Sequence, residues 1–139
     1  MANGVYEPEF GRLLDAILEQ PQSVKEIVRR NPESIEATNR AGENALRWCA
    51  LENRFDDVIN LRNLGSSIQS EALFEAIEHG NTDMLLLLLE LGGTITPSDA
   101  ASSLRIGKEF GDLSKRHAHI IISHLKAHGC DVAASGENF

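Results

Sequence analysis

A short pattern, a glycine followed three positions later by a β-branched residue, recurs along this chain at nearly regular intervals. It ends at Ile68, Ile95 and Val132, and a weaker copy without the glycine ends at Ile35. The intervals are therefore 33, 27 and 37 residues. Two short segments with apolar residues at helical spacing precede each end. A repeat of this length is typical of stacked supersecondary units, so we expect paired helices that pack in series.

Aligning the first three copies places similar residues in three columns. The columns are Leu13, Leu46 and Leu73; Ala16, Cys49 and Ala76; and Ile17, Ala50 and Ile77. Small residues in the second column would let the first helices of consecutive copies approach closely, while the larger apolar residues fill the layer between copies. No segment alternates apolar and polar residues with period two, so we predict an all-α fold. The predicted helices span 9–20, 22–31, 44–53, 55–64, 70–79, 81–92, 97–109 and 113–128.

Length and charge limit the function classes. The chain has 139 residues, enough for one domain, and 42% of them are hydrophobic. Its formal net charge of −8 repels phosphate backbones and anionic lipids. We therefore expect no nucleic-acid or membrane partner, and we expect a basic protein surface to be attracted.

The cysteine and hydropathy patterns predict a cytoplasmic protein. Cys49 and Cys130 form no CxxC pair, which favours reduced thiols in a reducing compartment. The first ten residues lack the basic and apolar regions of a secretory signal, and the longest apolar run, 84–89, is too short to span a bilayer.

The second copy, NRAGENALRWCALENRFDDVINLRNLGSSI, resembles the ankyrin repeat. Asn39 stands where that family has aspartate, Gly42 at the turn glycine, residues 44–47 at the TPLH motif and Gly65 at the terminal glycine. EALFEAIEHGNTDMLLLLLELGGTI and HAHIIISHLKAHGCDV resemble a shortened third and a capping fourth repeat. Tetratricopeptide repeats have a similar length, but their tryptophan and closing proline pattern is absent.

The resemblance implies an ankyrin-like helical solenoid of about four helix-turn-helix repeats in a single domain over 1–132. The repeats lie near 9–35, 36–68, 69–95 and 96–132, and we expect a flexible tail over 133–139. The third copy is six residues short before Leu73, so the β-hairpin fingers between repeats are expected to be shortened or absent. The fourth copy is four residues longer than 33, which we assign to a loop around Phe110.

Negative charge is concentrated in one part of the chain. No Lys or Arg lies between Arg62 and Arg105, and this gap contains Glu71, Glu75, Glu78, Asp83, Glu90 and Asp99. Glu71, Glu75 and Glu78 are spaced to share one side of a helix, where like charges repel. The pattern has two interpretations, a solvated helix face or an acidic strip that docks a basic protein.

The ankyrin resemblance also implies partner-binding positions, in the turn and after the paired small residues of the first helix. In this chain they are Arg40, Ala41 and Glu43 in the turn, then Leu51 and Glu52, and Glu78 and His79. Trp48 is the only tryptophan, and it is either a binding anchor or a packed core residue. The predicted partner-binding set is therefore Arg40, Glu43, Trp48, Leu51, Glu52, Glu71, Glu75, Glu78 and His79.

Catalytic and metal-binding motifs are missing. The sequence has no phosphate loop, no GxGxxG and no GxSxG, and Cys49 falls in a column predicted to be buried and inert. His124 and His128 are spaced to share a zinc ion, but no HExxH motif or third ligand accompanies them. We expect no enzyme activity, no cofactor and no metal.

These observations predict a non-enzymatic protein-protein interaction module. It would bind a basic protein through an acidic concave face, as an inhibitor or as an immunity protein of a toxin or effector. An adaptor or scaffold is one alternative, and a histidine-based metal or pH sensor in the last repeat is another. We expect the free protein to be a monomer.

Overall fold

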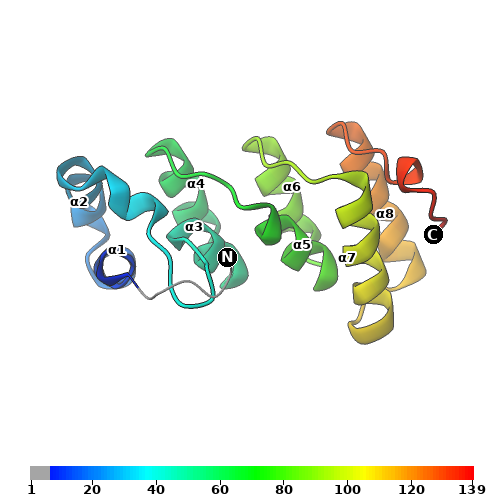
Figure 1. Ribbon diagram of the computed structural model, residues 1–139, viewed down its shortest axis with the longest axis horizontal. Helices are drawn as coiled ribbons and strands as arrows, with labels where there is room; N and C mark the ends of the chain where they lie inside the picture. The colour runs from blue at the N-terminus through cyan, green and yellow to red at the C-terminus, as the bar shows by residue number, and fades with distance from the viewer. Residues whose placement is uncertain (1–6) are drawn as a thin grey trace. The chain divides into compact units, whose positions relative to one another are not determined.

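The computed structural model describes residues 7–139, which are helical almost throughout (Figure 1). The α-helices are α1 (Pro8–Glu19), α2 (Val24–Arg30), α3 (Ala45–Leu51), α4 (Phe55–Asn63), α5 (Ser70–Glu78), α6 (Thr82–Glu90), α7 (Pro97–Phe110) and α8 (Lys115–Ala127). Three 3-10 helices are η1 (Pro21–Ser23), η2 (Pro32–Glu36) and η3 (Val132–Ser135). Each predicted helix overlaps one of the eight α-helices, so the all-α prediction is confirmed.

Residues 1–6 lie outside the described residues. The sequence analysis includes them in the domain and in the segment checked for a secretory signal. Among residues 7–139, none of the helices combines the length and the hydropathy needed to traverse a lipid bilayer.

The chain divides into two compact units, one ending at Ser67 and the other running from Ile68 to Phe139. The sequence analysis treats 1–132 as one domain, and the boundary between the units lies one residue before its border between the second and third repeats. The first unit contains α1 to α4 and the second contains α5 to α8. Each unit therefore contains two helix pairs.

The three alignment columns form the cores of these units. Every residue in them is buried, from Leu13 in α1 to Ile77 in α5. In the first unit, α1 packs on α3, and in the second unit α5 lies beside α7 and α6 beside α8 (Figure 1). Burial of one apolar face per helix is the main stabilising contribution in such an arrangement.

Left-handed backbone conformations recur at equivalent positions in the helix pairs. The glycines of the repeat pattern, Gly65, Gly92 and Gly129, have φ angles of 105°, 98° and 90° and follow the second helices α4, α6 and α8. Asn53 and Gly80, with φ angles of 61° and 65°, lie between the first and second helices. Glycine and asparagine adopt this conformation at low cost, and it ends a helix sharply.

The connection between η2 and α3 contains the only β-bridge in the described part of the chain, between Thr38 and Asn44. Asn39 organises this turn, because its side-chain oxygen accepts hydrogen bonds from the backbone N–H groups of Ala41 and Glu43, both at 3.0 Å. The connection over 64–69 contains no β-bridge. Within residues 7–139, the backbone between helices therefore pairs only at this one isolated bridge.

Side-chain caps fix the starts of three helices in the second unit. Asn81 accepts a hydrogen bond from the backbone N–H of Met84 at the start of α6, and Thr96 and Ser114 act similarly for α7 and α8. Pro97 occupies the first turn of α7, where its missing N–H has no cost. Phe110 is the last residue of α7, so the loop predicted around it begins only at Gly111.

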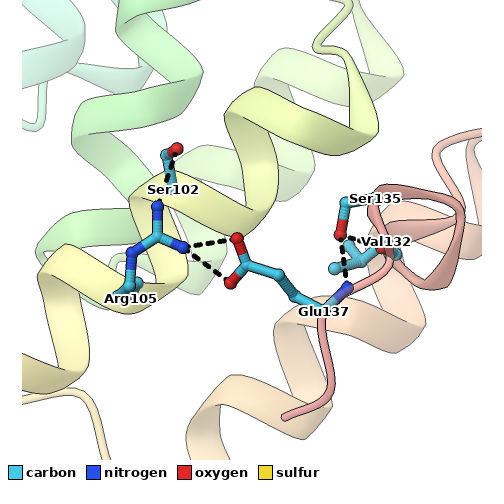
Figure 2. Close-up of polar contacts among 5 residues, drawn as sticks. All are labelled: Ser102, Arg105, Val132, Ser135 and Glu137. Atoms are coloured by element: carbon cyan, nitrogen blue, oxygen red, sulfur yellow. Dashed lines mark hydrogen bonds and ion pairs between the residues drawn. The ribbon is translucent and has the colours of Figure 1, made fainter.

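The segment predicted to be a flexible tail, 133–139, contains the end of η3 and is bonded to α7. The Glu137 carboxylate accepts two hydrogen bonds from Nη1 of Arg105, at 2.5 and 2.6 Å (Figure 2). Ser135 donates to the carbonyl oxygen of Val132, whose own side chain is buried. We call residues 132–139 the strap.

Candidate functional site

The turn residues of the predicted set have different roles. Arg40 is exposed, whereas Glu43 is half-buried. One carboxylate oxygen of Glu43 accepts a hydrogen bond from the Asn39 side chain at 2.8 Å. Glu43 therefore stiffens the turn, and Arg40 is the turn side chain that is available to a partner.

On α3, Trp48 and Leu51 form a small apolar spot. They are three residues apart and so share one side of the helix. Trp48 is half-buried, so its burial is intermediate between that of a packed core residue and that of an exposed binding anchor. Leu51 is 37% exposed. Glu52 follows at the end of α3 and is exposed. The spot is thus bordered by a carboxylate.

The opposite side of α3 contains a buried cysteine whose pKa is raised. Cys49 is completely buried, and burial, reinforced by the nearby Asp57 carboxylate, raises the pKa of its thiol to about 12. A thiol with such a pKa is almost entirely protonated at neutral pH and is a poor nucleophile. Cys130 is also buried, and burial raises its pKa as well.

On α5, the three glutamates of the strip lie opposite the buried side. Ala72, Leu73, Ala76 and Ile77 form that buried side. Glu71 is exposed, whereas Glu75 and Glu78 are half-buried. Burial raises the pKa of Glu78, the adjacent His79 lowers it and Glu75 raises it. Glu78 is therefore a partly desolvated carboxylate.

Two large apolar residues that the sequence analysis missed are exposed on α7, the helix that packs against α5. Ile106 is 42% exposed and Phe110 is 82% exposed, and their spacing places them on one side of the helix. The glycines that follow them, Gly107 and Gly111, approach the Glu78 carbonyl oxygen closely, since a β-carbon on either would lie 3.0 or 2.9 Å from it. We call Glu78, Ile106 and Phe110, with the exposed Glu109, the α5–α7 surface.

Two signals in the sequence could have revealed this surface. Ile106 and Phe110 are four residues apart, and the small residues Ala100, Ala101 and Gly107 mark the side of α7 that approaches another helix. Assigning Phe110 to a loop hid the first signal, because loop residues have no fixed face.

The predicted set falls into two groups. Arg40, Glu43, Trp48, Leu51 and Glu52 belong to the first unit, and Glu71, Glu75, Glu78 and His79 belong to the second. Within each group the residues belong to the same or neighbouring elements, the turn before α3 and α3 itself in the first unit, and α5 with the following His79 in the second. The structure thus defines one local surface around α3 and another around α5 and α7.

Two histidines of α8 and His128, which follows the helix, contact protein atoms. Nε2 of His117 lies 2.6 Å from Oγ1 of Thr82, and Nδ1 of His128 lies 2.9 Å from the carbonyl oxygen of His124. Nε2 of His119 lies 2.5 Å from the carbonyl oxygen of Phe139. Within residues 7–139, no three His, Cys, Asp or Glu side chains are arranged to hold a metal ion.

Comparison of the chain with models of protein families, with curated proteins and with solved structures finds no match. The candidate site therefore rests on the side chains described above.

Proposed function

We propose that the protein is a non-enzymatic interaction module that binds a basic protein, with the α5–α7 surface as its main contact. The observation that carries this proposal is the 82% exposure of Phe110 on α7, the helix whose Gly107 and Gly111 pack against the backbone of the partly desolvated Glu78. The spot formed by Trp48 and Leu51 on α3 would be a second contact.

The apolar part of this surface favours a protein partner. Exposing a large aromatic ring to water is unfavourable, and aromatic residues are enriched in the cores of protein interfaces. Phe110 and Ile106 would provide the apolar anchors, and their burial would contribute most of the binding free energy.

The charged part favours a basic partner. Glu78 forms no ion pair within the described residues, and the exposed Glu109 is three positions from Ile106. Partial burial makes a carboxylate bind cations more strongly than it would in bulk water. An arginine or lysine of the partner would therefore form a charge-assisted hydrogen bond with Glu78.

We further infer that the helix pairs are divergent ankyrin-like repeats in a solenoid. This inference is supported by the buried alignment columns, by the short finger at Thr38 and Asn44, and by the repeated left-handed glycines. In this proposal the protein is a cytoplasmic monomer that inhibits its partner, in the way that an immunity protein covers the basic cleft of a toxin or effector.

A defined peptide tests the proposal. Binding of a fluorescein-labelled basic peptide, GKKLFKKG, is measured by anisotropy for the wild type and for Glu78→Lys, Phe110→Ser and Glu90→Lys. Glu90 is exposed at the end of α6, so E90K is a charge-matched control in the same unit. We expect E78K and F110S each to weaken binding by about tenfold and E90K to have less than about a twofold effect.

Two results would contradict the proposal. Equal weakening by E78K and E90K would mean that only the overall charge attracts the peptide. Unchanged binding by F110S would mean that the exposed ring is not an anchor.

A further inference from the structure

The last long helix, α8, has a charge opposite to that of the chain as a whole. It contains Lys115, Arg116, Lys126 and three histidines but no acidic residue, although the net charge of the protein is −8. Neither Lys115 nor Arg116 forms an ion pair within the described residues. This cationic region is therefore not used to balance the acidic residues of the same chain.

The cations of α8 surround an exposed apolar side chain. Lys115, Arg116, His119, Ile120 and Ser123 line a shallow hollow, which we call the α8 face. Ile120 is 44% exposed at this face, whereas the next residue, Ile121, is buried in the core. A hollow with an apolar centre and a cationic rim can hold a segment in which an apolar side chain is flanked by negatively charged groups.

The strap shows what this region of the second unit binds. Arg105 holds the Glu137 carboxylate (Figure 2), and Nζ of Lys108 lies 5.7 Å from the centre of the Phe139 ring, within range of a cation–π interaction. His119 contacts the carbonyl oxygen of Phe139. The cations here thus hold a segment that combines a carboxylate with an aromatic ring.

The strap and the α8 face are adjacent. His119 and Ser123 line the hollow of the α8 face, and they also line the cavity against which Glu137 and Phe139 lie. The strap lines only the second of these hollows, so Lys115, Arg116 and Ile120 remain open to another segment of similar chemistry.

We propose that the α8 face binds an acidic segment of a partner protein in which an apolar side chain lies beside carboxylates. The carboxylates pair with Lys115 and Arg116, and the apolar side chain covers Ile120. This site differs from the α5–α7 surface in its helix and in the sign of its charge, so the inference does not rest on the function proposed above. A protein with both sites would join a basic partner to an acidic one.

A peptide is a better fit to this face than a polyanion. Six acidic residues and no Lys or Arg lie between Arg62 and Arg105, and all six belong to the same unit as α8. This negative charge would repel an extended phosphate backbone or an anionic bilayer. A short acidic segment has fewer negative charges than these polyanions, so the same carboxylates repel it less.

The test uses an unlabelled acidic peptide, GEELFEEG, titrated into the isotopically labelled wild-type protein while backbone amide shifts are followed by NMR. We expect the largest shifts between Lys115 and Ser123. A fluorescein-labelled copy then gives affinities for Lys115→Glu/Arg116→Glu, for Ile120→Ser and for a control, Arg12→Glu/Lys126→Glu. The control makes the same change in net charge at exposed residues outside the α8 face.

We expect K115E/R116E to weaken binding by more than about tenfold, I120S by at least about threefold, and the control by less than about twofold. I120S keeps every charge, so it tests the apolar contact even if the double charge reversal disturbs folding. Binding of the basic peptide GKKLFKKG should be unchanged or stronger in K115E/R116E.

Three outcomes would overturn the inference. They are amide shifts that lie outside α8, equal weakening by K115E/R116E and the control, and tighter binding of a DNA oligonucleotide or phosphatidylserine vesicles than of the acidic peptide at the same salt concentration. None of them affects the proposal for the α5–α7 surface, which is tested with a different peptide and different variants.

Discussion

A β-carbon on Gly107 of α7 would lie 3.0 Å from the backbone carbonyl oxygen of Glu78 on α5. Glycine at this position therefore allows the two helices to approach closely. The same approach holds the backbone of Glu78 close to the helix that contains Ile106 and Phe110, so the α5–α7 surface depends on a glycine.

We predict that Gly107→Ala destabilises the protein. The added methyl group meets backbone atoms of Glu78 and the side chain of Leu113, so the helices must separate. The cost of this overpacking should exceed the higher helix propensity of alanine and give a net loss of about 1–2 kcal/mol. Chemical denaturation measures it, with Ser98→Ala on the exposed start of α7 as control. Stability equal to that of the control would show that the contact is loose.

Glu78→Gln should affect stability in a pH-dependent way. Burial raises the pKa of Glu78 in the folded state, so the ionised carboxylate costs stability at neutral pH, and this cost disappears as the pH falls through the folded pKa. We expect E78Q to melt at the same or a higher temperature than the wild type at pH 7, and the difference to vanish below about pH 4. Glu71→Gln on the exposed part of α5 is the control. A lower melting temperature for E78Q at pH 7 would contradict the assignment.

Cys49 should resist alkylation in the folded protein. Its thiol is completely buried and has a pKa of about 12, so little reactive thiolate reaches the reagent. Mass spectrometry after iodoacetamide treatment at pH 8 should find Cys49 modified only when denaturant is present. Rapid modification of Cys49 under native conditions, at the rate seen in denaturant, would mean that the core around α3 opens readily.

The strap should be held mainly by apolar burial. Val132 is 2% exposed, whereas the ion pair between Arg105 and Glu137 is partly exposed to solvent. We predict that Val132→Ala lowers the free energy of unfolding by about 2 kcal/mol and that Glu137→Ala lowers it by less than about 1 kcal/mol. Denaturant titrations at low and high salt give both values. A larger loss for E137A than for V132A would reverse this ranking.

The helices and their cores could be predicted from the sequence because their determinants are local. Pro97 marks the start of α7, the alignment columns mark the buried sides, and glycines such as Gly65 mark helix ends. In each case the deciding residues lie within a few positions of one another, so the helical period and the backbone preferences suffice.

The surfaces were decided by tertiary structure. Gly107 and Gly111 face Glu78 while Phe110 stays exposed on α7. The strap is held by burial of Val132 and by the contact of Arg105 with Glu137, 32 residues further along the chain. Such contacts leave no periodic trace in the sequence, since they depend on how separate helices pack. The sequence by itself determined the helices and their buried sides, and packing determined which of the remaining side chains stay exposed together.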